Sequence, residues 1–291
     1  MSPWIIGFVG LVLYPMVASL YFSFTHYDIV GSPVWIGLDN YRFMFTNDPF
    51  FWQAVKNTLW IIVVGVPLRI VFAIITATLL TRPRKGIRTY RTIYFLPSMA
   101  PPVAAALAFL YLFNPAFGPV NGILTSLGMK DPPQWFFSPG SSKWALVFLG
   151  LWGVGDAMII FLAGLLDVPR QLYEAADIEG ASAYQKFRFV TLPMLTPVIF
   201  FSLVIGVISG FQYFTQAYVA STTNHQRSDL GQPRNSLLFF SIYLYQQGFN
   251  YFRMGYASAM AWVLFLITMV CTVLLIKSSS RWVHYQGGMF R

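Results

Sequence analysis

Six long apolar windows dominate the sequence and leave little choice of fold. They cover about residues 4–24, 58–80, 92–113, 144–166, 194–219 and 255–276. A helix needs about 20 apolar residues to cross the hydrocarbon core of a bilayer. Lipid offers no hydrogen-bond partner to an unpaired backbone group, so the crossing segments should be helices. The sequence therefore predicts an all-α polytopic membrane protein with six transmembrane helices, forming a single domain over residues 1–291.

The third window differs from the others because it is rich in proline. Its central stretch "LPSMAPPVAAALAF" contains Pro97, Pro101 and Pro102. Proline removes a helical hydrogen bond and clashes with the preceding turn. We therefore expect this span to be kinked or broken.

Composition supports a membrane protein and argues against other classes. Only 10% of the residues are charged, compared with about 25% in soluble domains. The net charge of +9 does not indicate a nucleic-acid partner, because the basic residues form no single binding face. The one cysteine, Cys271, lies in an apolar window, so no intrachain disulfide is expected. The first window has no basic segment before it, and we expect no signal peptide.

The loop between the second and third windows sets the orientation. Its sequence "TRPRKGIRTYR" holds five basic residues and no acid. Cytoplasmic loops carry an excess of Lys and Arg, so we expect this loop in the cytoplasm. Six alternating crossings then place both termini and residues 167–191 in the cytoplasm as well. The loops near residues 25–55, 114–143 and 220–254 are expected to face outward.

A polar passage between the fourth and fifth windows carries both glutamates of the chain, in "YEAADIEGASAYQKFRFVTLPML". Gly180 can adopt the backbone conformation that ends a short helix. Ser182 followed by Gln185 fits a capping box that opens a second one. On this second helix Tyr184 and Phe187 share a face. The passage therefore predicts a compact helix–turn–helix outside the membrane.

This passage resembles the EAA motif of binding-protein-dependent ABC importer permeases, with Glu174-Ala175-Ala176 followed by Gly180 and Leu192-Pro193. The segments "LYPMVASLYFSF", "GLDNYRFMF", "NTLW" and "GYASAMAWVLF" resemble the carbohydrate-uptake branch, notably the first permease subunit of maltose and glycerol-3-phosphate systems. The resemblance implies a type I ABC importer permease fold whose coupling loop, about residues 167–192, docks into a cleft of a cytoplasmic ATPase. It assigns the ATPase-coupling role to Glu174, Ala175, Ala176, Asp177, Gly180, Ala181, Tyr184, Phe187 and Pro193.

The resemblance also implies the partners of the chain. Such an importer contains a second related permease subunit, two ATPase subunits and an extracytoplasmic solute-binding protein, and lies in the lipid of a bacterial or archaeal cytoplasmic membrane. The outward segment "STTNHQRSDLGQPRNS" stands where these permeases usually have a Gly-Gly-Pro turn. The chain has no G-x-x-x-x-G-K-[ST] phosphate loop, and its histidines are isolated. We therefore expect a transport subunit without enzymatic activity, metal or cofactor, with ATP and magnesium bound by the partner ATPase.

Arg69 and Asp156 are the charged residues that lie deep within the apolar windows. Intramembrane charges are candidates for function, and each lies roughly 16–18 Å from the cytoplasmic end of its window at 1.5 Å per residue. Their similar depth allows an ion pair. Three interpretations remain open: a pair that locks two helices, a pair that contacts substrate, or two groups that face a wet central cavity.

The substrate pathway is assigned from the resemblance, which places it at broken or small-residue regions of the core spans. These regions are "LPSMAPP", "WGVGDA" and "GFQYFTQ". Sugars offer hydroxyls to polar side chains and apolar ring faces to aromatic ones, whereas glycines there would equally serve helix packing. The candidate pathway residues are Arg69, Ser98, Trp152, Gly153, Asp156, Gly210, Gln212, Tyr213 and Gln216.

The predicted function is a permease subunit of an ATP-driven ABC importer that moves an oligosaccharide or related polyol from a binding protein into the cytoplasm. An ion-coupled secondary transporter is the alternative class; its inverted repeats and paired broken helices are not evident. A phosphorylated polyol such as glycerol-3-phosphate is the alternative substrate. Arg69 would serve its anion, whereas Asp156 beside it argues for a neutral sugar.

Overall fold

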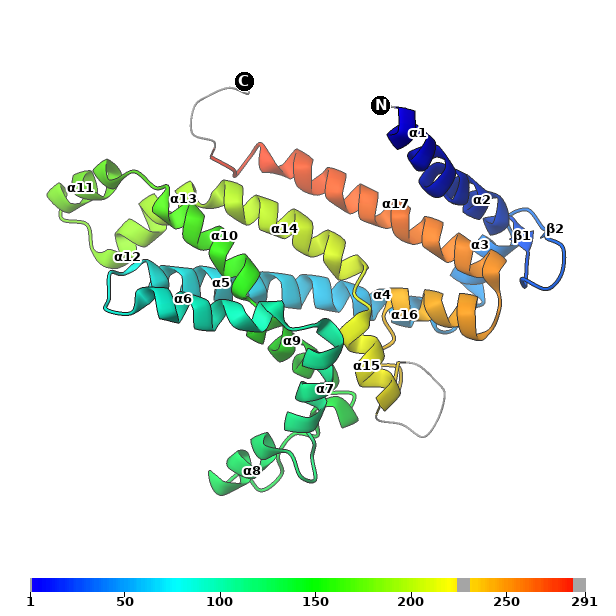
Figure 1. Cartoon of the computed structure of the whole chain (residues 1–291), viewed down its shortest axis with the longest axis horizontal. Coiled ribbons are helices and arrows are strands. Elements are labelled where there is room, and N and C mark those ends of the chain that lie inside the picture. Colours follow the sequence, from blue (N-terminus) through cyan, green and yellow to red (C-terminus); the bar gives the residue numbers. More distant parts are fainter. Residues whose placement is uncertain (1, 224–230, 285–291) are drawn as a thin grey trace.

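The computed structural model describes residues 2–223 and 231–284, and most of its helices run along one long axis (Figure 1). In the described part, four helices are long and apolar enough to cross a membrane, and six spans result if each of two bent helix pairs counts as one. The predicted all-α protein with six spans is confirmed. Residues 224–230 of the predicted outward loop lie outside the described part.

The elements that form the first three spans are as follows. The first span consists of α1 (Ser2–Phe8), a π-helical turn (Val9–Leu13) and α2 (Tyr14–Ser23). The strands β1 (Thr25–His26) and β2 (Val34–Trp35) and the helix α3 (Asp39–Thr46) follow. The second span consists of α4 (Phe51–Trp60), a π-helical turn (Ile61–Gly65) and α5 (Val66–Thr81). The third consists of α6 (Ile87–Phe95), a 3₁₀ turn (Leu96–Met99) and α7 (Pro102–Leu112), followed by α8 (Pro119–Ser126) and a 3₁₀ turn (Trp135–Phe137).

The remaining elements complete the chain. The fourth span consists of α9 (Ser142–Trp152) and α10 (Gly155–Leu166). Next come α11 (Arg170–Ile178), α12 (Ala183–Lys186), a π-helical turn (Phe187–Thr191) and α13 (Leu192–Met194). The fifth span consists of α14 (Thr196–Phe211) and α15 (Thr215–Thr223). After α16 (Phe240–Tyr245) and a π-helical turn (Gln246–Asn250), the sixth span is α17 (Met254–Ser279).

Three of the six spans are interrupted near the middle of the molecule. The third bends by 97° between α6 and α7, and the fourth bends by 51° between α9 and α10. At the first bend Ala100 is extended (ψ 134°), because a residue that precedes proline disfavours the helical conformation. The expected break of the third span is therefore confirmed. The fifth span loses its regular helix between Phe211 and Thr215, and α7, α8 and α15 lie to one side of the long bundle (Figure 1).

The second span forms the centre of the bundle, where α5 packs against α10 and α14. Glycines on α14 permit the close approach. A Cβ added at Gly206 would lie 2.6 Å from Val66 Cγ1, and one at Gly210 would lie 2.5 Å from Ile62 Cγ1. The first span, by contrast, packs through α2 against α17, and α1 has no buried residue. The face of α1 is thus left to lipid or to another chain.

The second span begins earlier than the expected residue 58, at Phe51. The additional turns at its start carry polar residues, so the apolar window appeared shorter than the helix. Asn57 and Thr58 hold the segment that follows Gly231 along the chain. The Asn57 side-chain amide donates to the carbonyls of Asn235 (2.7 Å) and Leu238 (2.9 Å), and the Phe240 N–H donates to the Thr58 hydroxyl (2.9 Å). These contacts place α16 against α4. The predicted outward loops therefore contain ordered helices.

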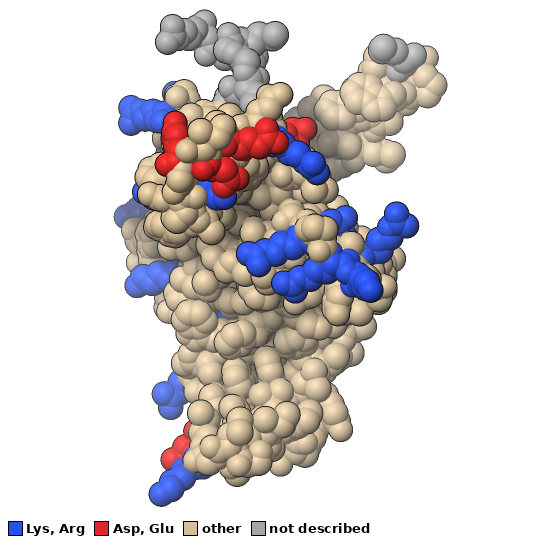
Figure 2. Space-filling model, turned by 90° about the vertical axis from the view of Figure 1, so that its left-hand side faces the viewer, with Lys and Arg blue, Asp and Glu red and all other residues tan. Residues whose placement is uncertain are grey.

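The two ends of the bundle differ in character. One end, here called the α11 end, carries α11, α12 and the link between α5 and α6; the other, the α16 end, carries α3, α16 and the start of α4 (Figure 1). Figure 2 views the α11 end and shows acidic side chains gathered on one part of it and several basic side chains grouped nearby. Basic residues 82–91 belong to this end, where Arg91 donates to the Leu80 carbonyl that ends the second span (2.9 Å).

Candidate functional site

The polar passage folds into the expected pair of short helices. The helix α11 ends at Ile178 and is followed by Gly180, whose φ of +73° is the left-handed conformation that glycine adopts readily. The next helix begins with a complete capping box. The Ser182 hydroxyl accepts from the Gln185 N–H (3.3 Å), and the Ser182 N–H donates to the Gln185 side chain (2.7 Å). The helix–turn–helix that Gly180, Ser182 and Gln185 predicted is therefore confirmed.

The two short helices are held together by side chains that face each other. Lys186 Nζ lies 2.5 Å from Asp177 Oδ1 and forms an ion pair across the turn. The Tyr173 hydroxyl hydrogen-bonds the Thr191 hydroxyl at 2.9 Å. These links join α11 to α12 and to the turn that leads into α14. The ion pair and the hydrogen bond therefore connect α11, α12 and the following turn into one unit.

Most of the predicted coupling residues lie open to a partner. No residue of α11 is buried, and Glu174, Ala175, Asp177 and Gly180 are exposed, whereas Ala176 and Ala181 are half-buried. Tyr184 has an exposed fraction of 72%. Phe187, which the sequence placed on the same face as Tyr184, is instead partly buried against the core cluster formed by α5, α10 and Leu195.

Two features of this surface were missed at the level of sequence. Ile178 is 89% exposed at the end of α11, and Phe189 is 72% exposed in the π-helical turn after α12. In the sequence, Ile178 directly precedes Glu179-Gly180, and this position beside a turn could have indicated that its side chain is exposed. Pro193, in α13, is half-buried and lies at the junction with α14.

The second candidate site is a cavity of about 190 Å³ between α5, α9–α10 and α14. Its walls are largely apolar, and its polar groups come from side chains on three spans. The lining includes Arg69, Asp156, Ser202, Ser209, Gly210 and Tyr213. The cavity thus contains four of the nine candidate pathway residues: Arg69, Asp156, Gly210 and Tyr213.

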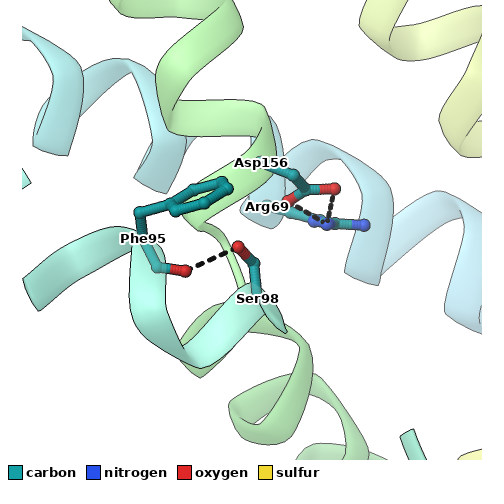
Figure 3. A network of polar contacts seen from close by, with 4 residues as sticks. All are labelled: Arg69, Phe95, Ser98 and Asp156. Atoms are coloured by element: carbon teal, nitrogen blue, oxygen red, sulfur yellow. Dashed lines mark hydrogen bonds and ion pairs between the residues drawn. The ribbon is translucent and has the colours of Figure 1, made fainter. Parts of the chain in front are cut away.

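Arg69 and Asp156 form an ion pair inside this cavity. Arg69 Nη2 donates to Asp156 Oδ1 (2.6 Å) and Oδ2 (2.9 Å), as Figure 3 shows. The side chains of Arg69 and Asp156 remain 41% and 58% exposed, respectively. The pair therefore faces the cavity and is not buried between packed helices. Arg69 Nε and the Ser202 hydroxyl are buried and have no hydrogen-bond partner in the described part of the chain. The sequence left pairing and cavity lining as alternatives for Arg69 and Asp156, and the structure shows both at once.

The break in the third span lies beside this pair. A Cβ at Gly155 would lie 2.6 Å from the Tyr94 carbonyl oxygen and 3.0 Å from Ser98 Oγ. Gly155 is the residue before Asp156, so only a glycine lets α10 begin this close to the broken span. The Ser98 hydroxyl donates to the Phe95 carbonyl (2.7 Å), beside the Arg69–Asp156 pair in Figure 3.

The other candidate pathway residues lie outside the cavity lining. Trp152 lines a separate hollow with Phe72 and Tyr94, and Gly153 is half-buried at the bend before α10. Gln212 is exposed and Gln216 is half-buried, and both follow the end of α14. The structure therefore concentrates the polar groups on α5, α10 and α14, and leaves the two glutamines apart from them.

Ser202 and Ser209 were missed, although the sequence contained a signal for them. Together with Gly206 and Tyr213 they recur at intervals of three and four residues along the fifth span, and all four line the cavity. Residues spaced in this way share one face of a helix. The spacing of these small and polar residues within an otherwise apolar window could therefore have predicted a polar face on the fifth span. In the described residues no group of three His, Cys, Asp or Glu is arranged to hold a metal ion.

Known proteins are similar to this chain in sequence and in fold. Residues 69–285 match the family described as binding-protein-dependent transport system inner membrane component. The probable ABC transporter permease protein YesP of Bacillus subtilis is 45% identical over 287 residues, which cover 98% of this chain and 91% of YesP. The arabinooligosaccharides transport system permease protein AraP of Bacillus subtilis is 33% identical, with 96% and 86% covered. The lactose transport system permease protein LacF of Rhizobium radiobacter is also 33% identical, with 90% and 87% covered.

A solved structure agrees with this assignment. A chain in the crystal structure of a bacterial alginate ABC transporter, in complex with an alginate pentasaccharide-bound periplasmic protein, matches with a TM-score of 0.79 and 25% identity, covering 96% of this chain and 92% of that one. The ABC importer permease predicted from the EAA motif is confirmed, and the ion-coupled alternative is set aside. The chain belongs to the family of binding-protein-dependent transport system inner membrane components.

Proposed function

We propose that this permease subunit carries a neutral oligosaccharide or related polyol across the membrane through the cavity that Arg69 and Asp156 line. The observation that carries the proposal is this ion pair, which faces a cavity between broken spans. Relatives named for arabinooligosaccharide and lactose transport support a sugar as the substrate class. Hydroxyl groups suit the pair, because a sugar hydroxyl both donates to a carboxylate and accepts from a guanidinium.

The charge balance of the cavity favours a neutral substrate over a phosphorylated one. Asp156 Oδ1 lies 2.6 Å from the Arg69 guanidinium and cancels its charge. A phosphate that approached Arg69 would meet the carboxylate of Asp156, and like charges at this distance repel strongly outside bulk water. Ser202 and Ser209 add neutral hydroxyls to the lining. The glycerol-3-phosphate alternative is therefore disfavoured.

We propose that α11 and α12 form the docking surface for an ATPase subunit that binds ATP and magnesium. Glu174 offers a carboxylate and Tyr184 an aromatic ring, and both are exposed. The basic link at residues 82–91, at the same end of the bundle, supports a cytoplasmic position for this end and for both termini. The other proposed partners are a second related permease subunit and an extracytoplasmic solute-binding protein.

The position of the coupling loop in the chain suggests how it acts on the substrate cavity. It directly joins α10, which carries Asp156, to α14, which carries the serine and glycine stripe. A displacement of the loop by the ATPase would move two walls of the cavity relative to α5 and Arg69. Coupling then needs no long relay, because the driven segment connects the two cavity walls along the chain.

Reconstitution of the complete importer tests this proposal. We expect ATP-driven uptake of an arabino-oligosaccharide or lactose by the wild type with its binding protein. Glu174→Ala and Gly180→Pro should retain the sugar-binding cavity yet uncouple ATP hydrolysis from uptake, because they alter the docking helix and its turn. Lys130→Ala, at an exposed position near α8, is the control and should leave coupling intact. Uptake that persists without any ATPase and follows a proton gradient would overturn the proposal.

A further inference from the structure

A second polar pocket lies at the α16 end, far from the cavity between the spans. It measures about 460 Å³ and is lined by residues from α3, the segment just before α4, the segment after Gly231, α16 and the turn that follows it. The cavity lining begins at Ile61 on the second span, so about 15 Å of helix separate its near end from Phe51, and about 27 Å separate Arg69 from Phe51, at 1.5 Å per residue. The pocket is therefore distinct from the cavity that contains Asp156.

One wall of this pocket is fixed by a buried carboxylate. Asp48 is 5% exposed and accepts hydrogen bonds from the Tyr243 hydroxyl (2.7 Å), from the Tyr256 hydroxyl, and from the N–H groups of Phe50 (2.9 Å) and Phe51 (3.2 Å). Burial, and then its hydrogen bond to Asp48, raises the pKa of the Tyr243 phenol well above its ordinary value, so it remains a neutral donor. Asp48 thus joins α4, α16 and α17. Its hydrogen bonds hold all four donor groups in place, so none of them moves into the pocket.

The turn after α16 supplies an unsatisfied polar group. Gln247 is 4% exposed, and its carbonyl oxygen Oε1 has no hydrogen-bond partner among the described residues. A buried acceptor without a partner costs about 1–3 kcal/mol, so such groups call for an explanation. Its neighbour Gln246 donates from Nε2 to the Tyr251 hydroxyl (3.0 Å), which leaves the hydroxyl hydrogen of Tyr251 available. The pocket therefore combines a free acceptor with a free donor.

The remaining lining matches the chemistry of a sugar ring. Gln232 and Asn235 contribute neutral amides, and Phe43 and Phe50 contribute aromatic rings that are about two-fifths exposed. Neutral amides bind hydroxyls without the desolvation penalty of a charged group, and aromatic faces cover the apolar side of a sugar ring. Among the described lining residues Asp48 supplies the one carboxylate, and it is already bonded by protein donors.

We propose that the pocket at the α16 end is a second carbohydrate subsite, which binds one sugar unit of an oligosaccharide before the chain reaches the cavity between the spans. The inference rests on the proposed sugar-import function. Gln247 Oε1 accepts a sugar hydroxyl, Tyr251 donates to another, and the ring lies against Phe50. In the proposed orientation the pocket faces outward, where the binding protein delivers its sugar.

A site-directed labelling experiment tests this subsite on the complete complex in nanodiscs. Arg253 lies exposed in the lining, so Arg253→Cys in a Cys271→Ala background places one reactive thiol at the pocket. The probes are arabinobiose, arabinotetraose and lactose. We expect the sugar that the complex imports to slow maleimide labelling of this thiol. Gln247→Leu should raise the half-protecting concentration about tenfold, as the loss of one hydrogen bond to ligand does.

Controls separate the subsite from other effects. Gln134→Leu makes the same substitution at an exposed site outside the pocket and should leave protection unchanged. Ser126→Cys, exposed on α8, should not be protected. If the wild type imports sugar but sugar never protects Arg253→Cys, or Gln247→Leu protects as well as wild type, the subsite is overturned and the proposed function stands. Protection by the sugar-free binding protein alone would overturn it too, in favour of a docking pocket. If wild type imports none of the probes, both proposals fail.

Discussion

Removing one member of the Arg69–Asp156 pair should destabilise the permease, and removing both should cost no more than removing either one. For charges 4 Å apart the attraction is about 1 kcal/mol in water and about 4 kcal/mol at an effective dielectric constant of 20. The side chains are 41% and 58% exposed, so solvent screening reduces the larger value. An intermediate figure of about 2 kcal/mol is therefore expected for the pair, from the same Coulomb range.

A double-mutant cycle measures this value. Arg69→Met and Asp156→Asn should each lower the unfolding free energy by about 2 kcal/mol, because each leaves an unpaired polar or charged partner. The double variant should lose no more than either single one, since no charge is left alone. Unfolding in an SDS titration, followed by circular dichroism, gives the free energies. Lys130→Met, at an exposed position after α8, is a control outside the pair.

Transport adds a second measurement to the cycle. The swapped variant R69D/D156R keeps an ion pair and should recover stability. It should not recover sugar uptake, because the swap exchanges the donor and acceptor positions at the cavity wall, and the uptake KM should rise. Strictly additive losses in the double variant would refute the pairing energy. Full recovery of uptake by the swap would refute substrate contact and leave a pair that only locks α5 to α10.

Three further outcomes follow from packing and backbone geometry. Tyr243→Phe should lower the unfolding free energy by about 1.5–3 kcal/mol, because Asp48 loses a hydrogen bond to a charged acceptor; a thermal shift below that of a surface Tyr→Phe control would contradict it. Gly210→Ala should cost about 1–3 kcal/mol by overpacking against Ile62, and Ile62→Ala in the same chain should relieve it; an unchanged melting curve for the single variant would show that α14 lies farther away. Gly180→Ala should cost about 1–2 kcal/mol because its φ is positive, and should lower ATPase-coupled uptake more than binding of sugar; equal loss of both would indicate general misfolding.

The local features of this chain were readable from its sequence because they depend on neighbouring residues. Apolar windows of about 20 residues predicted the spans, and Ser182 with Gln185 predicted a cap that the structure contains. The similar depth of Arg69 and Asp156 in two windows allowed an ion pair, which the structure contains. Pro101 and Pro102 predicted the break in the third span, since their effect on the preceding residue is local.

Features that depend on distant segments could not be predicted in this way. The bond from Tyr243 to Asp48 spans 195 positions, and those from Asn57 to the segment after Gly231 span nearly as many. No periodicity in either segment indicates its partner, so the pocket at the α16 end was not predicted. For the same reason Gln212 and Gln216 were grouped with Tyr213 by proximity in sequence, whereas of the three only Tyr213 lines the cavity.

The cavity stripe and the docking helices occupy adjacent but separate stretches of the chain, and this has a consequence for how such transporters diverge. Ser202 lies 11 positions after Thr191, the last residue before α13, which is about three helical turns. Substitutions at the stripe can alter which sugar fits without changing a residue of the proposed docking helices α11 and α12. A single ATPase could in this way serve several permeases with different substrates, and selection for a new nutrient would act on α5 and α14 while α11 stays constant.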